Sequence, residues 1–214
     1  FTTHFGDTDT TPRSIDSTNH SRTTTVVGPV VRSAANFLRT TLLEAGAKLL
    51  QARRQDVELC DRGVSMRSDS SRSVSFTSIA ELNGGAIVCA AERERAPEGI
   101  FPAMFAAHFV EVEVNTRTGR VSVTRAVCAH DAGRVINPLL AESQVHGGFL
   151  QGMGMALQEQ RVLDPRTGHM LNATMWAYRT PSIVDAPVSI RFVNAGRPDG
   201  ANSLGVKGIG EPPL

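Results

Sequence analysis

Glu211 is a carboxylate whose surroundings in the sequence suit a general base. It follows a glycine-rich segment, residues 205–210, and precedes Pro212 and Pro213. Glycine permits positive φ and the close approach of a ligand, and a proline restricts the residue before it to extended backbone. A carboxylate on such a constrained backbone can be held in one orientation toward a proton donor. The alternative interpretation is a polar turn, because short motifs of this kind recur by chance.

A second candidate segment, residues 144–157, consists of small and apolar residues and predicts a helix. It carries glycines at positions 147, 148, 152 and 154. Each costs about 1 kcal/mol relative to alanine inside a helix, so we expect something to approach this backbone closely. A bulky neighbour packed against the helix would satisfy this expectation. Tight packing of the helix within a core is the alternative.

Both segments resemble motifs of the molybdenum hydroxylases, the family of xanthine dehydrogenases, aldehyde oxidases, carbon monoxide dehydrogenases and isoquinoline oxidoreductases. Residues 205–213 are similar to the family's G-x-K-G-x-G-E-P-P segment, and residues 144–157 to its Q-x-E-G-G-x-x-Q-G-x-G-x-A-L segment. Near the amino end, Gly6–Pro12 and Ser21–Thr24 resemble its G-D-T-x-x-T-P and S-R-x-T segments. His146 departs from the resemblance, because the family usually has an acidic residue there, and His20 and Pro29 are also atypical.

The resemblance implies a hydroxylase that uses water as the oxygen source and acts on an electron-poor carbon of an aldehyde or an N-heteroaromatic substrate. Glu211 would be the base that takes the proton from a molybdenum-bound hydroxide, and Gln144 would hydrogen-bond the oxo ligand. An amide suits that position because its NH₂ group donates without adding charge beside an anionic centre. The implied contacts with the pterin and its pyrophosphate are His20, Ser21, Arg22, Thr23, Lys207 and Gly208. The alternative role for Lys207 is to order the loop that carries Glu211.

The implied cofactor is molybdenum–molybdopterin, with the cytosine dinucleotide form as one option, and its dithiolene rather than protein side chains holds the metal. Cys60, Cys89 and Cys128 show no C-x-x-C pairing and cannot build an iron–sulfur cluster alone. The 2Fe–2S clusters are therefore expected on a partner chain or in another region, with a flavin or a cytochrome as electron acceptor. A non-catalytic assembly or scaffold domain that keeps the fold without the cofactor is the alternative function.

Length and composition agree with a portion of a globular subunit. The chain has 214 residues, 41% of them hydrophobic and 20% charged, and a net charge of +1, which gives no electrostatic case for nucleic acid or an anionic membrane. No stretch approaches the ~20 apolar residues that cross a bilayer. Because the family's subunits are several-fold longer, we expect residues 1–214 to be a carboxyl-side portion of a molybdopterin-binding domain, incomplete at both ends and inactive alone.

The location and the substrate follow less directly from the sequence. Three free cysteines, expected to be small buried side chains, favour a reduced cytoplasmic protein, and a periplasmic location stays open because a signal region would be missing. The resemblance leaves the substrate open, because the lining residues that sort substrates lie mostly outside this chain. Residues 172–187 resemble the isoquinoline oxidoreductase branch more than the purine branch.

The pattern of elements predicts an α+β fold with helices packed on antiparallel sheet. A helix is expected from Gly28-Pro29, with a buried face formed by Val31, Ala34, Ala35, Leu38, Leu42, Ala45 and Leu49. Residues 51–75 read as an irregular surface excursion and residues 85–91 as a buried strand. Residues 106–130 alternate as a hairpin, with His108 and His130-Asp131 in structural strand-end roles. A helix after Asn137-Pro138 to about residue 160, a hairpin over 162–171 and a strand over 188–192 complete the prediction.

Overall fold

The computed structural model describes residues 7–11, 18–92, 98–100, 103–193 and 202–211, and the chain divides into two compact units. The smaller unit is Val26–Glu94, and the larger unit joins Phe1–Thr25 to Arg95–Leu214. The sequence showed no linker between them. Each unit has its own core and is described by itself.

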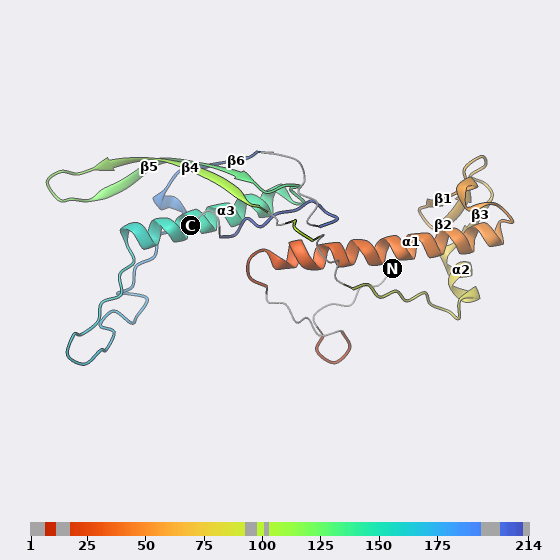
Figure 1. Cartoon of the computed structure of the whole chain (residues 1–214), viewed down its shortest axis with the longest axis horizontal. Helices are drawn as coiled ribbons and strands as arrows, with labels where there is room; N and C mark the ends of the chain where they lie inside the picture. Colours follow the sequence, from red (N-terminus) through yellow and green to blue (C-terminus); the bar gives the residue numbers. More distant parts are fainter. Residues whose placement is uncertain (1–6, 12–17, 93–97, 101–102, 194–201, 212–214) are drawn as a thin grey trace. The chain divides into compact units, whose positions relative to one another are not determined.

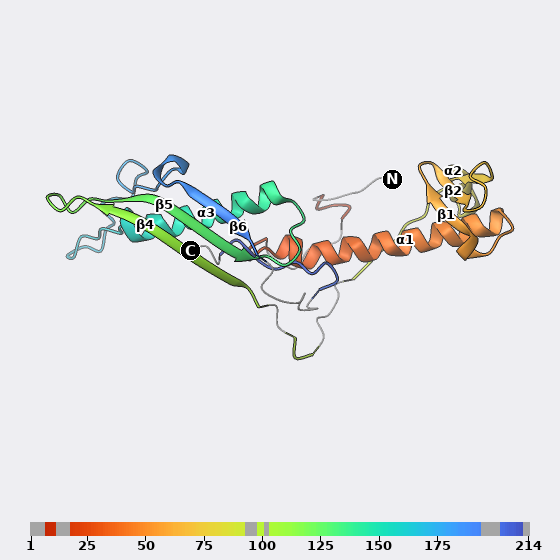
Figure 2. The same cartoon turned by 90° about the horizontal axis from the view of Figure 1, so that it is seen from above.

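In the smaller unit, a long helix packs on a three-stranded antiparallel sheet. The helix, α1 (Gly28–Leu49), has a proline in its first turn and continues from a π-helical turn, η1 (Thr23–Val27), while η2 (Arg54–Asp56) leads into the sheet. The strands β1 (Val57–Cys60), β2 (Gly63–Met66) and β3 (Ser73–Ser75) pair in that order. A short helix, α2 (Phe76–Leu82), follows, with the Ser75 hydroxyl accepting from the Ser78 amide as its N-cap. Figure 2 shows α2 and the strands beside the end of α1.

Two sequence predictions for this unit are wrong. Residues 51–75 are not an irregular excursion, because they contain the sheet, whose Val57 and Val64 are fully buried. Strands of three to four residues offer too few positions for the alternation to stand out against polar neighbours. Residues 85–91 form no strand, and Val88 is 87% exposed. The backbone at the start of this segment, at Gly84 and Gly85, has positive φ, which is not strand geometry. An apolar run alone also does not supply a partner strand for hydrogen bonding.

The helix α1 is confirmed, but its buried face is only partly the predicted one. Leu42 is buried as expected, whereas Val31 is 47% exposed. The core lies under the second half of the helix, where one face contacts the sheet; its buried members are Leu42, Leu43, Ala47, Leu50, Val57, Val64 and Ile79. Gly46 lies at this contact, because a Cβ there would come within 2.6 Å of the Val64 side chain.

The larger unit contains a three-stranded sheet covered on one face by a helix (Figure 1). Strands β4 (Phe105–Val114) and β5 (Val121–Asp131) form the predicted antiparallel hairpin, with a bulge between Glu111 and Val112. Strand β6 (Val188–Phe192), preceded by η3 (Ile183–Asp185), pairs with β5 in parallel. The α+β class is thus confirmed, and the sheet is mixed rather than purely antiparallel. Parallel pairing needs a long connection, which the following helix supplies.

That helix, α3 (Pro138–Leu157), confirms the prediction for the glycine-rich segment and ends three residues earlier than expected. The Asn137 side chain accepts from the Leu140 amide at its start. Its buried residues pack on the sheet in a core of Val123, Ala126, Cys128, Val145, Phe149, Met153 and Ala186. Close approach explains Gly154, where a Cβ would lie 2.7 Å from Pro181 Cδ, but nothing lies within 4 Å of a Cβ built at Gly147.

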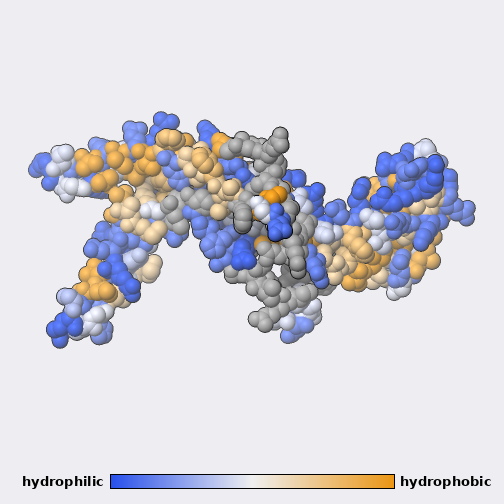
Figure 3. Space-filling model, in the orientation of Figure 1, coloured by the Kyte–Doolittle hydropathy of each residue, from blue (hydrophilic) through white to orange (hydrophobic). Residues whose placement is uncertain are grey.

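The remaining predicted elements are present in reduced form. The 162–171 hairpin is a single bridge between Leu163 and Met170 around the turn at Asp164. Of the three cysteines only Cys128 is buried; Cys60 is exposed and Cys89 intermediate, so the expectation of three buried thiols is wrong. Apolar side chains on the β4–β5 hairpin reach the surface (Figure 3). Among the described helices, none combines the length and apolar character of a membrane span.

Candidate active site

The segment that carries Glu211 is attached to the end of strand β5. Val206 forms a β-bridge with Gly133, the Arg134 amide donates to Gly205 O over 2.7 Å, and the Lys207 amide donates to Ala132 O over 3.0 Å. Gly133 has φ +60°, and a Cβ there would lie 2.3 Å from Gly205 O. Only glycine therefore permits this close approach. The residues that directly follow β5 therefore fix where the Glu211 segment lies.

A buried ion pair strengthens this attachment. Lys207 Nζ lies 2.8 Å from Asp131 Oδ2, and the two side chains are 8% and 5% exposed. The other oxygen of the same carboxylate accepts from the Gly133 amide. The ammonium group of Lys207 is thus engaged with the end of β5, which favours its role in ordering the loop over direct contact with a cofactor.

The Glu211 carboxylate lies against the turn that contains His20. Its Oε1 accepts from the His20 backbone amide over 3.0 Å and lies 3.4 Å from His20 Nδ1. His20 and Ser21 both have positive φ, 52° and 53°, and the Arg22 amide closes the turn on Asn19 O. This backbone conformation is uncommon for residues other than glycine, and it turns the His20 amide toward the carboxylate.

Ser21 and Gln144 lie beside the same segment. The Ser21 hydroxyl accepts from the Ile209 amide over 3.1 Å. A Cβ built at Gly210 would lie 3.7 Å from Gln144 Oε1 and 3.8 Å from Ser21 Oγ. Three segments far apart in the sequence, the His20–Ser21 turn, helix α3 and residues 208–211, therefore meet at one place.

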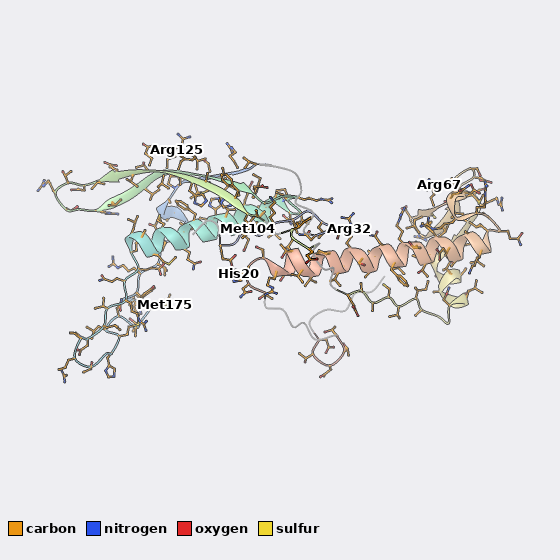
Figure 4. The ribbon with its side chains drawn as sticks, viewed as in Figure 1. His20, Arg32, Arg67, Met104, Arg125 and Met175 are labelled. Atoms are coloured by element: carbon orange, nitrogen blue, oxygen red, sulfur yellow. The ribbon has the colours of Figure 1, made fainter. Side chains whose placement is uncertain are left out.

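The other candidate residues lie next to this meeting point. A Cβ at Gly208 would come within 2.8 Å of Met104 Sδ and 3.6 Å of His20 O; Figure 4 labels His20 and Met104. Arg22 and Thr23 follow Ser21 directly, and Thr23 begins η1. Met104 had no signal in the sequence, whereas Asp131 stood out only as the residue after a strand-end histidine. Gly6, Pro12, Pro212 and Pro213 of the motifs lie outside the described residues.

A second group of titratable side chains lies under helix α3. His108 and His130 are diagonal neighbours on the hairpin, with their Nε2 atoms 2.8 Å apart, and His130 is 1% exposed. Burial lowers the pKa of His108; burial and then the neighbouring His108 lower the pKa of His130. Burial also raises the pKa of Cys128 to about 11. The lowered pKa values of both histidines favour their neutral forms, in which one imidazole donates and the other accepts, in keeping with a structural role.

This neutral pair predicts acid sensitivity of the larger unit. An unfolded histidine titrates near pH 6.5, whereas both folded histidines bind protons only at lower pH. The unfolded chain therefore gains protons first, and the free energy of unfolding falls as pH drops below 6.5, by up to about 1.4 kcal/mol per pH unit and per histidine. Hydrogen exchange of β5 amides at pH 7.5 and 5.5 measures this loss of protection. In His130→Gln, which cannot be protonated, we expect a smaller difference between the two pH values; an equal difference would contradict the assignment.

An apolar cavity of about 310 Å³ lies between the hairpin and α3. Within the part of the chain that the structure describes, His108 is its one titratable lining residue, and the other lining residues are Val110, Val112, Val123, Phe149, Gly152, Met153, Ala156 and Leu157. Gln144 and Glu211 do not line it. Among the described residues, no group of three His, Cys, Asp or Glu side chains could hold a metal ion.

The chain belongs to the molybdopterin cofactor-binding domain family, whose model matches residues 2–187. Among its relatives, the large subunit of nicotine 6-hydroxylase from Paenarthrobacter nicotinovorans is 30% identical over 91% of this chain. The molybdenum-binding subunit PaoC of an aldehyde oxidoreductase from Escherichia coli is 44% identical over 50% of this chain. The match covers 24% of the first relative and 15% of the second, so this chain corresponds to a fraction of either subunit.

Two solved enzyme structures share the fold. Cu,Mo-CO dehydrogenase superposes with a TM-score of 0.77 at 23% identity, covering 97% of this chain and 26% of the enzyme's chain. Quinoline 2-oxidoreductase from Pseudomonas putida 86 gives a TM-score of 0.68 over 90% of this chain and 25% of the enzyme's chain, also at 23% identity. Identities this low establish the fold alone.

Proposed function

We propose that this chain forms one wall of the molybdopterin site of a molybdenum hydroxylase, with Glu211 as its base. The observation that carries the proposal is the meeting of Glu211, Gln144 and the Ser21 turn around Gly210. These are the residues that the family resemblance assigns to the proton acceptor, to the metal's oxygen ligand and to the pterin. Their convergence from three separate segments is what a shared ligand requires, because one molecule cannot contact distant surfaces.

The residues present fit such a cofactor. Gly147 lies one turn after Gln144 on the same side of α3, and among the described residues no atom outside the helix backbone lies within 4 Å of a Cβ built there. The helix backbone is therefore accessible beside the amide of Gln144. Arg22 directly precedes the helical run that begins at Thr23, and its guanidinium group suits contact with a pyrophosphate. A metal held through a pterin needs no cluster of protein ligands.

When bound, the cofactor supplies the two-electron oxidation of the substrate. The chain's own residues orient groups and move a proton. The Glu211 carboxylate accepts a proton at one oxygen while its other oxygen is held by the His20 turn. The Gln144 amide donates a hydrogen bond without adding charge. Lys207 keeps the loop in place through Asp131 rather than contacting the ligand.

The substrate class that we propose is an aldehyde or an N-heteroaromatic compound. Support comes from the names of the relatives, since a nicotine 6-hydroxylase matches 91% of this chain and an aldehyde oxidoreductase subunit is 44% identical over half of it. Both relatives are subunits by name. We therefore also propose a partner that carries iron–sulfur clusters and a flavin or cytochrome electron acceptor. For the cofactor we propose two forms to be distinguished, molybdopterin itself and its cytosine dinucleotide.

Metal and cofactor analysis of the protein that contains this chain tests the proposal. Molybdenum and pterin should be present at about one equivalent per protomer, and nicotine, quinoline, xanthine and benzaldehyde should be assayed with an artificial electron acceptor. Turnover of at least one compound is expected. Protein that folds but binds neither molybdenum nor pterin would refute the proposal and leave the scaffold function in its place.

Replacement of Gln144 by alanine should slow turnover by about 10- to 100-fold, because it deletes one hydrogen bond to a charged group. Molybdenum content should stay near the wild-type value, since the base and the Ser21 turn remain. Gln144→Glu, of equal size but negatively charged, should lose more activity than Gln144→Ala. Steady-state rates and metal content per protomer measure these effects. Wild-type rates in Gln144→Ala would reduce Gln144 to a packing residue.

A further inference from the structure

His20 makes two contacts with the same oxygen of Glu211. The backbone amide donates to Oε1 over 3.0 Å, and ring Nδ1 lies 3.4 Å from Oε1. Both contacts depend on the positive φ of 52° at His20, which places its amide and its ring on the side of the carboxylate. A non-glycine residue in this conformation is uncommon, and the turn closed by Arg22 and Asn19 holds it there.

We propose that His20 is a positioning residue for the Glu211 carboxylate, an inference that rests on the base role proposed above. The amide and the ring together hold Oε1, so that Oε2 is the oxygen that accepts the proton. A carboxylate free to rotate about its last bond would present either oxygen. The backbone amide donates to one oxygen and ring Nδ1 lies against that same oxygen, so the two contacts together favour a single orientation.

The exposure of the pair indicates that orientation, rather than stability, is what this contact provides. The His20 and Glu211 side chains are 68% and 43% exposed, and exposed ion pairs contribute little to folding. The neighbouring side chains Ser21 and Gln144 are neutral, and the Lys207 ammonium is engaged with Asp131. The imidazole is therefore the side chain whose replacement changes the contact with Oε1 most directly.

Three substitutions at position 20 distinguish the contribution of the imidazole ring from that of the backbone amide. Glycine, asparagine and aspartate all tolerate positive φ, so each keeps the turn and its amide donor. His20→Gly removes the ring, His20→Asn places an amide donor close to the position of Nδ1, and His20→Asp has the same shape as asparagine but carries a negative charge and no donor. Asparagine and aspartate thus form a matched pair that a purely structural role would not distinguish.

In the complete protein, with whichever compound of the substrate panel it turns over, kcat should fall about tenfold in His20→Gly and about 100-fold in His20→Asp. His20→Asn keeps a donor and should therefore lose the least activity, and the losses should fall on kcat rather than on KM, as expected for a group that orients the base. Hydrogen exchange of residues 205–211 in cofactor-free protein supplies a readout without turnover: it should speed up in His20→Asp and not in His20→Asn. In a Glu211→Gln background this difference should disappear.

Equal kcat and equal exchange in the asparagine and aspartate variants would overturn the role of His20. This result is distinguishable from failure of the proposed function. If Glu211→Gln retains full turnover, the base assignment itself is wrong. If Glu211→Gln is inactive while the two position-20 variants behave alike, Glu211 keeps its role and His20 loses its own.

Discussion

Glu211→Gln should reduce turnover by about 10²- to 10⁴-fold, the contribution typical of a general base. The neutral glutamine side chain cannot accept the proton, but it has the same size as glutamate. Its oxygen can still accept the hydrogen bond that the His20 backbone amide donates to Glu211 Oε1 over 3.0 Å. Molybdenum and pterin content should therefore remain near the wild-type values. Single-turnover rates with a substrate of the panel, together with metal analysis, measure both quantities.

A shorter carboxylate provides the control for this substitution. Glu211→Asp keeps the negative charge on a side chain that is one methylene shorter. If the role of the residue is to accept a proton, this variant should retain more activity than Glu211→Gln. Activity of Glu211→Gln close to that of the wild type would remove Glu211 from the mechanism. Loss of molybdenum together with activity would instead indicate a role in cofactor retention.

Asp131→Asn should destabilise the attachment of the Glu211 segment by about 3 to 5 kcal/mol, because it removes the carboxylate that pairs with the buried Lys207 ammonium. Asparagine keeps the oxygen that can accept from the Gly133 amide, so the effect reports on charge. The ion pair is almost fully buried, with side-chain exposures of 8% and 5%. Exchange of the amides of residues 205–211 should accelerate by about 10²- to 5 × 10³-fold, and turnover should fall with it.

The matched control for this prediction removes both charges. Asp131→Asn combined with Lys207→Met removes both charges of the pair, so it should recover much of the lost protection, since a buried ion pair can be replaced by uncharged residues at small cost. If the single Asp131→Asn variant exchanges at the wild-type rate, the ion pair does not hold the loop. The attachment would then depend on the backbone hydrogen bonds of Gly205 and Lys207 alone.

The larger unit could be predicted well from sequence because its elements are long and strongly patterned. Strands β4 and β5 alternate over about ten residues each, and α3 opens with the Asn137-Pro138 signal. The parallel pairing of β6 with β5 could not be predicted, because local patterns carry no information about which strands become neighbours. The short strands β1 to β3 were missed for the related reason that three or four residues give too few positions to show a period.

The candidate site shows the same division between local and long-range information. Glu211 and Gln144 could be selected from their motifs, and the structure brings them to one place with Ser21. The partner of Lys207 could not be selected, because Asp131 lies 76 residues away and only the fold joins them. His20 was chosen as a pterin contact, whereas its observed partner is Glu211, a relation that no local pattern encodes.

The contact between His20 and Glu211 spans 191 residues, and this separation bears on the order in which the molecule assembles. The β4–β5 hairpin closes around the short turn at residues 115–120, whereas the site must close a loop more than thirty times longer. For a flexible chain that difference costs about 3 kcal/mol more entropy. Local elements form before contacts of long sequence separation, so the hairpin and α3 should form before the His20 turn reaches Glu211. The proton-accepting geometry is accordingly among the last features to appear during folding, and a chain that has completed its sheet can still lack its site.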